Sequence, residues 1–128
     1  MPTSNNGFTL VEIMIVLAIV GILAFFAYPN YQNYLTRSYR NEAKYALLDL
    51  ANQMENYYSK HQTYESAAVN LTALTNRYTL SVIQASKTTY ILQATPINTD
   101  AYCQSFTLNQ DGEKDITGAP KGTVEQCW

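Results

Sequence analysis

Residues 7–28 read GFTLVEIMIVLAIVGILAFFAY, and this stretch decides most of what the sequence predicts about the fold. It is a long apolar run that contains one carboxylate, Glu12, close to its start. As a helix rising ~1.5 Å per residue, a run of this length crosses the ~30 Å hydrocarbon core of a bilayer. The sequence therefore predicts a membrane-spanning helix at residues 8–29, with residues 1–7 before it and a head at residues 30–128 after it.

Glu12 is the unusual residue of this run, because an ionised carboxylate inside a membrane costs on the order of 2.5–3.5 kcal/mol or more. A cut between Gly7 and Phe8 would create a positively charged amine within one helical turn of Glu12. If such helices pack side by side, the amine and the carboxylate can pair within a chain or between chains. The alternative is that Glu12 lies at the membrane edge and reaches water.

The motif consists of Gly7, then Phe8, and then Glu12 as the fifth residue after the cut. It resembles the prepilin-peptidase site of type IV pilins and type II secretion pseudopilins. Further features, similar to minor pilins of the PilE type, are Pro29, Tyr31, Tyr34, the stretch 40–58, the His-Gln-Thr-Tyr run at 61–64 and the final Cys127-Trp128. The resemblance implies that residues 1–7 are a leader removed by prepilin peptidase and that Phe8 becomes an N-methylated N-terminus. It also implies that residues 8–29 form the filament-core helix after assembly.

The same resemblance implies a structural function. The chain would wait in the bacterial inner membrane and then join an extracellular pilus, or fimbrium, through its N-terminal helix. Its partners would be other pilin subunits in a homo- or hetero-filament, prepilin peptidase and the inner-membrane assembly machinery. We expect a minor pilin that is not an enzyme, with no cofactor, no metal and no catalytic residue. The alternatives are a major pilin, an adhesive or DNA-binding minor pilin, and a type II secretion pseudopilin.

Gly21 and Pro29 weaken the second half of the apolar run. Pro29 has no amide donor and its ring clashes with the preceding turn of a helix. Gly21 costs a helix roughly 1 kcal/mol relative to Ala. Residues 21–29 are therefore the expected place for the helix to bend or melt, and the resemblance points to an extended conformation of this stretch in assembled filaments.

Beyond Pro29 the apolar residues recur at spacings of three and four, which predicts one face of a helix from residue 30 to about residue 60. This face consists of Ala43, Ala46, Leu47, Leu50, Met54, Tyr57 and Tyr58. The polar face consists of Glu42, Lys44, Asp49, Asn52, Gln53 and Glu55. An amphipathic helix of this kind needs a cover for its apolar face.

Alternating segments at residues 78–82, 90–94 and 106–108 predict strands that form this cover, and residues 115–117 predict a short fourth strand. Asp111-Gly112 signals a turn before the fourth segment. Consecutive strands with short links favour an antiparallel meander. We therefore predict an α+β pilin fold, in which a long N-terminal helix packs on a sheet of three or four antiparallel strands with a disulfide loop at its C-terminal end.

Cys103 and Cys127, the two cysteines of the chain, predict one disulfide in an oxidising compartment. Closing a loop of this length contributes up to ~3.5 kcal/mol in the chain-entropy account. A metal site is the rival interpretation, but two cysteines without clustered histidines fall short of four ligands. The positive-inside rule, applied to Arg37, Arg40 and Lys44, would place the head in the cytoplasm. We give the cysteines more weight and expect the head outside it.

The charge balance of 8 basic and 10 acidic residues contains no block of either sign. It argues against binding of bulk nucleic acid, so DNA is an unlikely though not excluded partner. The 11 tyrosines are expected to fill a small core with their hydroxyls at its edge, and an adhesive surface is the alternative.

Three weaker patterns are expected to carry no chemistry. His61 is expected to be a solvated histidine at a helix C-terminus, where a positive charge interacts favourably with the helix dipole. Asp111, Glu113 and Asp115 resemble a calcium loop but supply too few ligands, so a solvated turn is expected. Asn70-Leu71-Thr72 matches the glycosylation sequon, which occurs often by chance.

Overall fold

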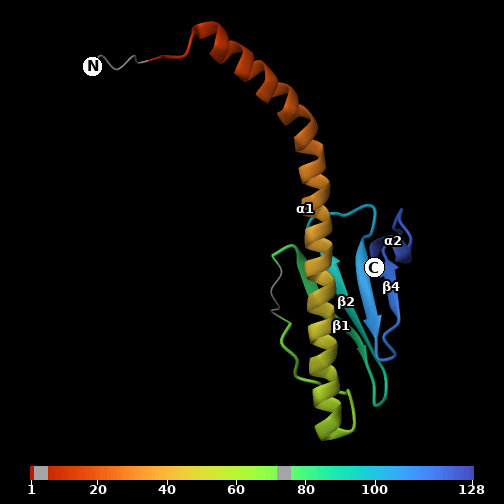
Figure 1. Ribbon diagram of the computed structural model, residues 1–128. Helices are drawn as coiled ribbons and strands as arrows, with labels where there is room; N and C mark the ends of the chain where they lie inside the picture. The colour runs from red at the N-terminus through yellow and green to blue at the C-terminus, as the bar shows by residue number, and fades with distance from the viewer. Residues whose placement is uncertain (2–5, 72–75) are drawn as a thin grey trace. The chain divides into compact units, whose positions relative to one another are not determined.

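A computed structural model of this chain describes residues 1, 6–71 and 76–128. The elements follow one another as α1 (Leu10–His61), β1 (Tyr78–Ala85), β2 (Tyr90–Pro96), β3 (Ser105–Asn109), β4 (Lys114–Thr117) and α2 (Val124–Cys127), as Figure 1 shows. The chain divides into two compact units, Met1–Thr36 and Arg37–Trp128, and helix α1 contributes residues to both.

The unit Met1–Thr36 contains the apolar half of α1, which is helical from Leu10 onward and passes through Pro29 without interruption. Because proline has no N–H, the carbonyl four residues earlier, that of Phe25, loses its usual donor. The side-chain amide of Asn30 donates to the carbonyl of Phe26 at 3.2 Å, one position further on. The predicted continuity of the membrane-length helix with the amphipathic helix is therefore confirmed.

The unit Arg37–Trp128 contains a four-stranded sheet in the order β1-β2-β3-β4, with each neighbouring pair antiparallel. This is the predicted meander. One row of directly paired residues crosses all four strands through Leu80, Ala94, Phe106 and Ile116. All four side chains are buried, so the alternation in each strand places this row on the core face of the sheet.

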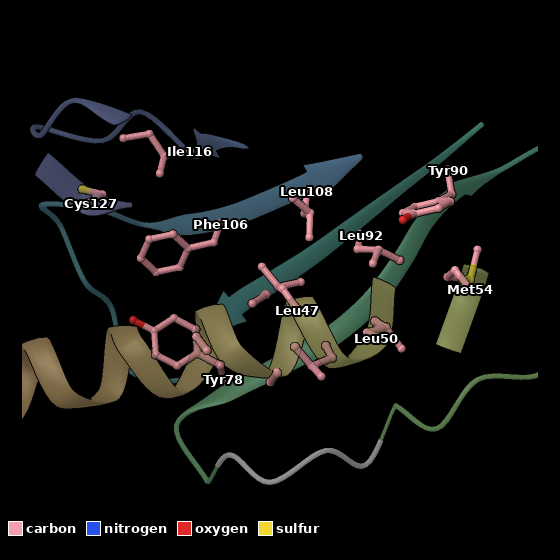
Figure 2. Close-up of a cluster of buried hydrophobic side chains, with 14 of the residues drawn as sticks. Leu47, Leu50, Met54, Tyr78, Tyr90, Leu92, Phe106, Leu108, Ile116 and Cys127 are labelled. Atoms are coloured by element: carbon pink, nitrogen blue, oxygen red, sulfur yellow. The ribbon is translucent and has the colours of Figure 1, made fainter. Parts of the chain in front are cut away.

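The core lies between this face of the sheet and the amphipathic half of α1, and Figure 2 shows side chains from both sides meeting there. Five residues of the predicted helix face are buried: Ala43, Ala46, Leu47, Leu50 and Met54. Tyr57 and Tyr58, predicted on the same face, are only half-buried. Tyr58 stacks on Tyr64 with a ring separation of 4.5 Å, so the last turns of α1 pack against the following loop.

Glu55, predicted on the polar face of the helix, accepts hydrogen bonds from the hydroxyls of two buried tyrosines. Its Oε1 accepts from the hydroxyl of Tyr64 at 3.0 Å and from that of Tyr90 at 3.4 Å. Burial, and then the charge of Glu55, raises the pKa of Tyr90, because the phenolate would be poorly solvated beside a carboxylate. These two tyrosines place their rings in the core and their hydroxyls at its edge, as expected.

Two local features differ from the sequence-based expectation. Strand β1 continues to Ala85, and its pairing with β2 shifts register between Val82 and Gln84, which marks a bulge that strand alternation does not reveal. Residues 124–127 form the short helix α2, which the sequence did not predict. The backbone amide of Thr123 donates to Gln126 Oε1 at 3.1 Å, so a local cap supports a helix too short to form by itself.

Candidate functional site

Gly7 and Phe8, the predicted processing site, lie before the first turn of α1 and are exposed. A Cβ atom added at Gly7 would meet nothing within 4 Å, so no contact with the described residues explains a glycine there. An exposed bond outside the helix is accessible to a peptidase. The leader residues 2–5 lie outside the described residues.

Thr9 and Glu12 form a reciprocal cap at the start of α1. The amide of Glu12 donates to Thr9 Oγ1 at 3.2 Å, and the amide of Thr9 donates to Glu12 Oε2 at 3.4 Å. This is a capping box, in which two free donors at a helix N-terminus are satisfied by the Thr-x-x-Glu pair. This capping function of Glu12 was not predicted from the sequence, although Thr-x-x-Glu before an apolar run is its signal.

The apolar half of α1 exposes a continuous hydrophobic surface. Its large exposed side chains from residue 10 to residue 23 are Leu10, Val11, Ile13, Met14, Ile15, Val16, Leu17, Ile19, Val20, Ile22 and Leu23. Among the described residues, α1 is the one helix long and apolar enough to cross a membrane. Soluble monomers rarely expose an apolar patch of this extent. This surface therefore needs lipid or other helices around it.

Gly21 and Pro29 both lie inside α1. A Cβ atom at Gly21 would meet nothing within 4 Å, so the glycine is not required by packing within this chain. Its cost to the helix is therefore not offset by a close contact among the described residues. The predicted function of residues 21–29 as a stretch that extends on assembly stays a prediction.

The predicted disulfide joins Cys103 to Cys127 with their Cα atoms 5.7 Å apart, and both residues are buried. It ties the segment before β3 to α2. Next to it, the indole of Trp128 packs edge-to-face on Phe106 at 5.5 Å and donates from Nε1 to the carbonyl of Asp115 at 2.9 Å. The disulfide and the Trp128 contacts together hold the C-terminal segment on the sheet.

Arg40 and Asp100 form a two-pronged ion pair in the head. Arg40 Nε and Nη2 donate to the two carboxylate oxygens at 2.7 and 2.9 Å. Burial alone would raise the pKa of Asp100, but the hydrogen bonds from Arg40 and from the amides of Cys103 and Tyr102 outweigh it and hold that pKa below its ordinary value.

Lys44 is also part of the head, because its Nζ donates to the carbonyl of Cys127 at 3.0 Å. Burial, and then the charges of Arg40 and Lys114, lowers the pKa of Lys44. Arg40 and Lys44 therefore hold the head together. Their position after the apolar run is explained by the fold and does not require a cytoplasmic head.

A basic cavity of about 560 Å³ lies where this part of α1 meets the C-terminal segment. Its lining residues are Arg37, Arg40, Asn41, Lys44, Tyr102, Gln126 and Cys127. Within the described part of the chain, Arg37 has no ion-pair partner, whereas Arg40 is held by Asp100. The cavity thus combines one uncommitted guanidinium with two nearby cations, an arrangement that favours an anion.

The three weaker patterns have the following contacts among the described residues. His61 is exposed and stacks on Tyr57 at 4.1 Å. Asn109 Oδ1 accepts from the amides of Asp111 and Glu113 at 3.0 and 2.9 Å, which forms the predicted turn. No group of three potential metal ligands occurs among the described residues. Thr72 of the sequon lies outside the described residues.

Comparisons with known proteins agree with the fold and with the N-terminal site. A family profile described as "Type IV minor pilin ComP, DNA uptake sequence receptor" matches residues 29–107, more than half of the chain. A second profile, "Prokaryotic N-terminal methylation motif", matches residues 2–28. The two matches meet at Pro29, so one covers the apolar run and the other covers most of the head.

Individual relatives are described as fimbrial proteins and type IV pilins. The chain is 32% identical over 130 residues to a fimbrial protein of Neisseria meningitidis, and the aligned region covers 94% of this chain and 76% of that protein. It is 44% identical over 64 residues to the type IV major pilin protein PilA of Myxococcus xanthus, which covers 50% of this chain and 29% of PilA. The chain thus matches less than a third of the length of that relative.

Among solved structures, the non-core minor pilin PilV of Neisseria meningitidis is similar with a TM-score of 0.58 at 26% identity. The similarity covers 66% of this chain and 89% of PilV. A long N-terminal helix packed on a four-stranded antiparallel sheet, with a C-terminal disulfide, defines a pilin-type subunit. With the family matches, it follows that the chain belongs to the type IV pilins.

Proposed function

We propose that this chain is a structural subunit of a type IV pilus that is cut between Gly7 and Phe8 and polymerises through its N-terminal helix. The observation that carries this proposal is the fully exposed apolar surface of α1 in the unit Met1–Thr36. A helix with no covered face can exchange lipid for the corresponding helices of other subunits at little cost, because both surroundings are apolar.

Processing prepares the start of this helix for assembly. Removing residues 1–7 leaves a charged amine on Phe8, next to the capping pair of Thr9 and Glu12. The carboxylate of Glu12 then has a cationic partner nearby, either in its own chain or in a neighbouring one. Such a pair lowers the cost of keeping a charge in an apolar bundle, since its field is neutralised locally.

We infer that the subunit is a minor pilin, held in the bacterial inner membrane before assembly and extracellular afterwards. The family profile over residues 29–107 and the similarity to the minor pilin PilV support this assignment. The relatives also include major pilins, so abundance in the filament is the quantity to measure.

Quantitative mass spectrometry of sheared, purified filaments tests the proposal. We expect peptides that begin at a methylated Phe8, at an abundance far below that of the principal subunit. Absence of the chain from filaments, with the intact precursor in the membrane fraction, would contradict the structural function. An abundance equal to that of the principal subunit would contradict only the assignment as a minor pilin.

DNA binding by the head is a second candidate function. It is favoured by the basic cavity around Arg37 and Lys44 and by the profile description, which names a DNA uptake sequence receptor. The net charge of −2 makes strong binding to bulk DNA unfavourable, so contact would be confined to such a patch.

Filter binding of duplex DNA to the head, repeated over a range of salt concentrations, tests this second function. Arg37→Gln removes the guanidinium of the cavity that has no ion-pair partner among the described residues, and Lys60→Gln removes an exposed cation of the same helix outside the cavity. We expect Arg37→Gln to weaken binding and to reduce the salt slope by about one. Equal losses for the two variants would indicate diffuse electrostatic attraction and no specific site.

A further inference from the structure

A ridge of four aromatic side chains follows the apolar run on α1. Phe25, Tyr28, Tyr31 and Tyr34 recur at every third residue, so they form one of the oblique ridges of a helix surface. Each step of three residues turns the helix by about 300°, and four such residues therefore sweep around roughly half of its circumference.

None of these rings belongs to the hydrophobic core. Their exposed fractions are 76% for Phe25, 68% for Tyr28, 58% for Tyr31 and 68% for Tyr34. Buried aromatic rings are a main source of packing energy in proteins, so four exposed ones in sequence call for an outside partner. The only ring contact among them is an edge-to-face pair between Phe25 and the next residue, Phe26.

The position of the tyrosines along the helix indicates what that partner is. At ~1.5 Å per residue, Tyr28 lies ~24 Å beyond Glu12 along the helix axis and Tyr34 lies ~33 Å beyond it. The hydrocarbon core of a bilayer is ~30 Å thick. With Glu12 near one boundary of the core, the three tyrosines therefore straddle the other boundary.

The residues between the tyrosines fit the same place. Asn30, Gln32 and Asn33 introduce polar amides where the apolar run ends. The side chain of Gln32 donates to the hydroxyl of Tyr28 at 3.2 Å, so this ring already carries a polar partner at its tip. An apolar ring with a hydrogen-bonded hydroxyl is the kind of side chain that collects at the head-group layer of membranes.

We propose that Tyr28, Tyr31 and Tyr34 form an aromatic anchor that binds the lipid head-group layer and sets the depth of the stored subunit in the membrane. This inference rests on the proposed membrane residence of the chain before assembly. By fixing the depth of the helix, the anchor also fixes where Phe8 and Glu12 lie at the opposite face. When the subunit leaves the membrane and joins a filament, these rings must replace their contacts with lipid head groups by contacts with protein.

The test uses the full chain in phosphatidylethanolamine–phosphatidylglycerol vesicles, with a nitroxide label on Ile22→Cys in the middle of the apolar run. Both native cysteines are in the disulfide, so the label attaches at one place. The relative accessibility of the label to oxygen and to a water-soluble nickel complex reports its depth. This depth is compared between the unsubstituted helix and a variant with Tyr28→Ala, Tyr31→Ala and Tyr34→Ala.

We expect the triple alanine variant to shift the label by at least two residues' rise, ~3 Å, or to broaden its depth distribution. Replacing the same three tyrosines by Trp should keep the depth, because Trp prefers the same layer. Tyr45→Ala is the matched control, since Tyr45 is an exposed tyrosine of the same helix that lies in the unit Arg37–Trp128.

An unchanged depth in the triple alanine variant would overturn the anchor, and so would an equal shift caused by Tyr45→Ala. If that variant kept its depth but was lost from filaments, the ridge would be a contact between subunits instead. If the unsubstituted chain did not insert into vesicles at all, the proposed membrane residence would fail first. The two failures are therefore distinguishable.

Discussion

Thr9 and Glu12 hold each other across the first turn of α1, each donating its backbone amide to the side chain of the other, at 3.4 and 3.2 Å. Glu12 therefore has two separable properties. Its carboxylate oxygen caps the helix, and its negative charge is available to a cation. The amide of a glutamine can cap equally well, because a capping box accepts Glu or Gln at this position.

Glu12→Gln and Glu12→Val should both be processed and should both enter filaments poorly. A charge-assisted hydrogen bond is worth about 1.5–3 kcal/mol, so loss of the charge corresponds to roughly tenfold or more lower incorporation. Thr9→Val removes the hydroxyl acceptor but keeps the charge, and it should assemble nearly normally. The measurement is the ratio of variant to total pilin in sheared filaments. Wild-type incorporation of Glu12→Val would count against charge pairing, and normal incorporation of Glu12→Gln alone would favour capping.

Gly7→Leu should leave an uncleaved precursor in the inner membrane. The structure provides open space at this position, so the leucine does not disturb the fold of the chain. The defect would then arise where the peptidase approaches the backbone. Gly21→Ala, also in open space, is the control and should be processed. Intact-mass measurement of membrane fractions decides the matter, and normal loss of residues 1–7 from Gly7→Leu would refute the prediction.

A truncated chain beginning near Tyr34 should be soluble, fold alone and lose stability when Cys103–Cys127 is reduced. The unit Arg37–Trp128 contains the complete core, so truncation removes none of its buried residues. The expected loss on reduction is up to ~3.5 kcal/mol, seen as a lower melting temperature. A variant with both cysteines replaced by Ala controls for direct effects of the reductant. The same melting temperature before and after reduction would argue against a stabilising disulfide.

Asp100→Asn should destabilise the head at neutral pH and should reduce the loss of stability that the head shows at acidic pH. The pKa of Asp100 is depressed in the folded state, so its contribution is present above the unfolded value and is lost as the pH falls through the folded value. Breaking the Arg40 pair should cost on the order of 1–3 kcal/mol at pH 7 and progressively less as the pH falls through the depressed pKa of Asp100. Denaturant unfolding of both proteins at several pH values measures this. A difference in stability that is independent of pH would show that the charge of Asp100 is not the cause.

Residues 21–29 should become extended when the subunit joins a filament, although α1 is continuous through them in the single chain. Pro29 already leaves one carbonyl without a donor, and Gly21 lowers the cost of leaving helical geometry. Raising the rise from ~1.5 Å to ~3.3 Å over about eight residues would lengthen the stretch by ~14 Å. A filament reconstruction with unbroken helical hydrogen bonding from Phe8 through Tyr34 would rule this mechanism out.

The local pattern of the sequence was sufficient for the helix and the meander. Apolar spacing of three and four placed Leu47, Leu50 and Met54 on the buried face of α1, because a helix repeats every 3.6 residues whatever covers it. Alternation did the same for the strands. The short motif of Gly7, Phe8 and Glu12 lies within the matched methylation motif, and cleavage at this motif stays a prediction. The cysteine pairing followed from there being only two cysteines.

Only the tertiary structure decided which distant polar groups meet. Arg40 pairs with Asp100 across 60 residues of sequence, and Lys44 reaches the carbonyl of Cys127 across 83. No periodicity specifies such pairs, because each depends on where a loop returns to the helix. Glu55 illustrates the same limit: helical spacing placed it on the wet face, but the loop after α1 and strand β2 bring two tyrosine hydroxyls to its carboxylate. The sequence therefore determined the elements and their apolar faces. The folded chain determined which charged side chains form ion pairs and which, like Arg37, have no ion-pair partner among the described residues.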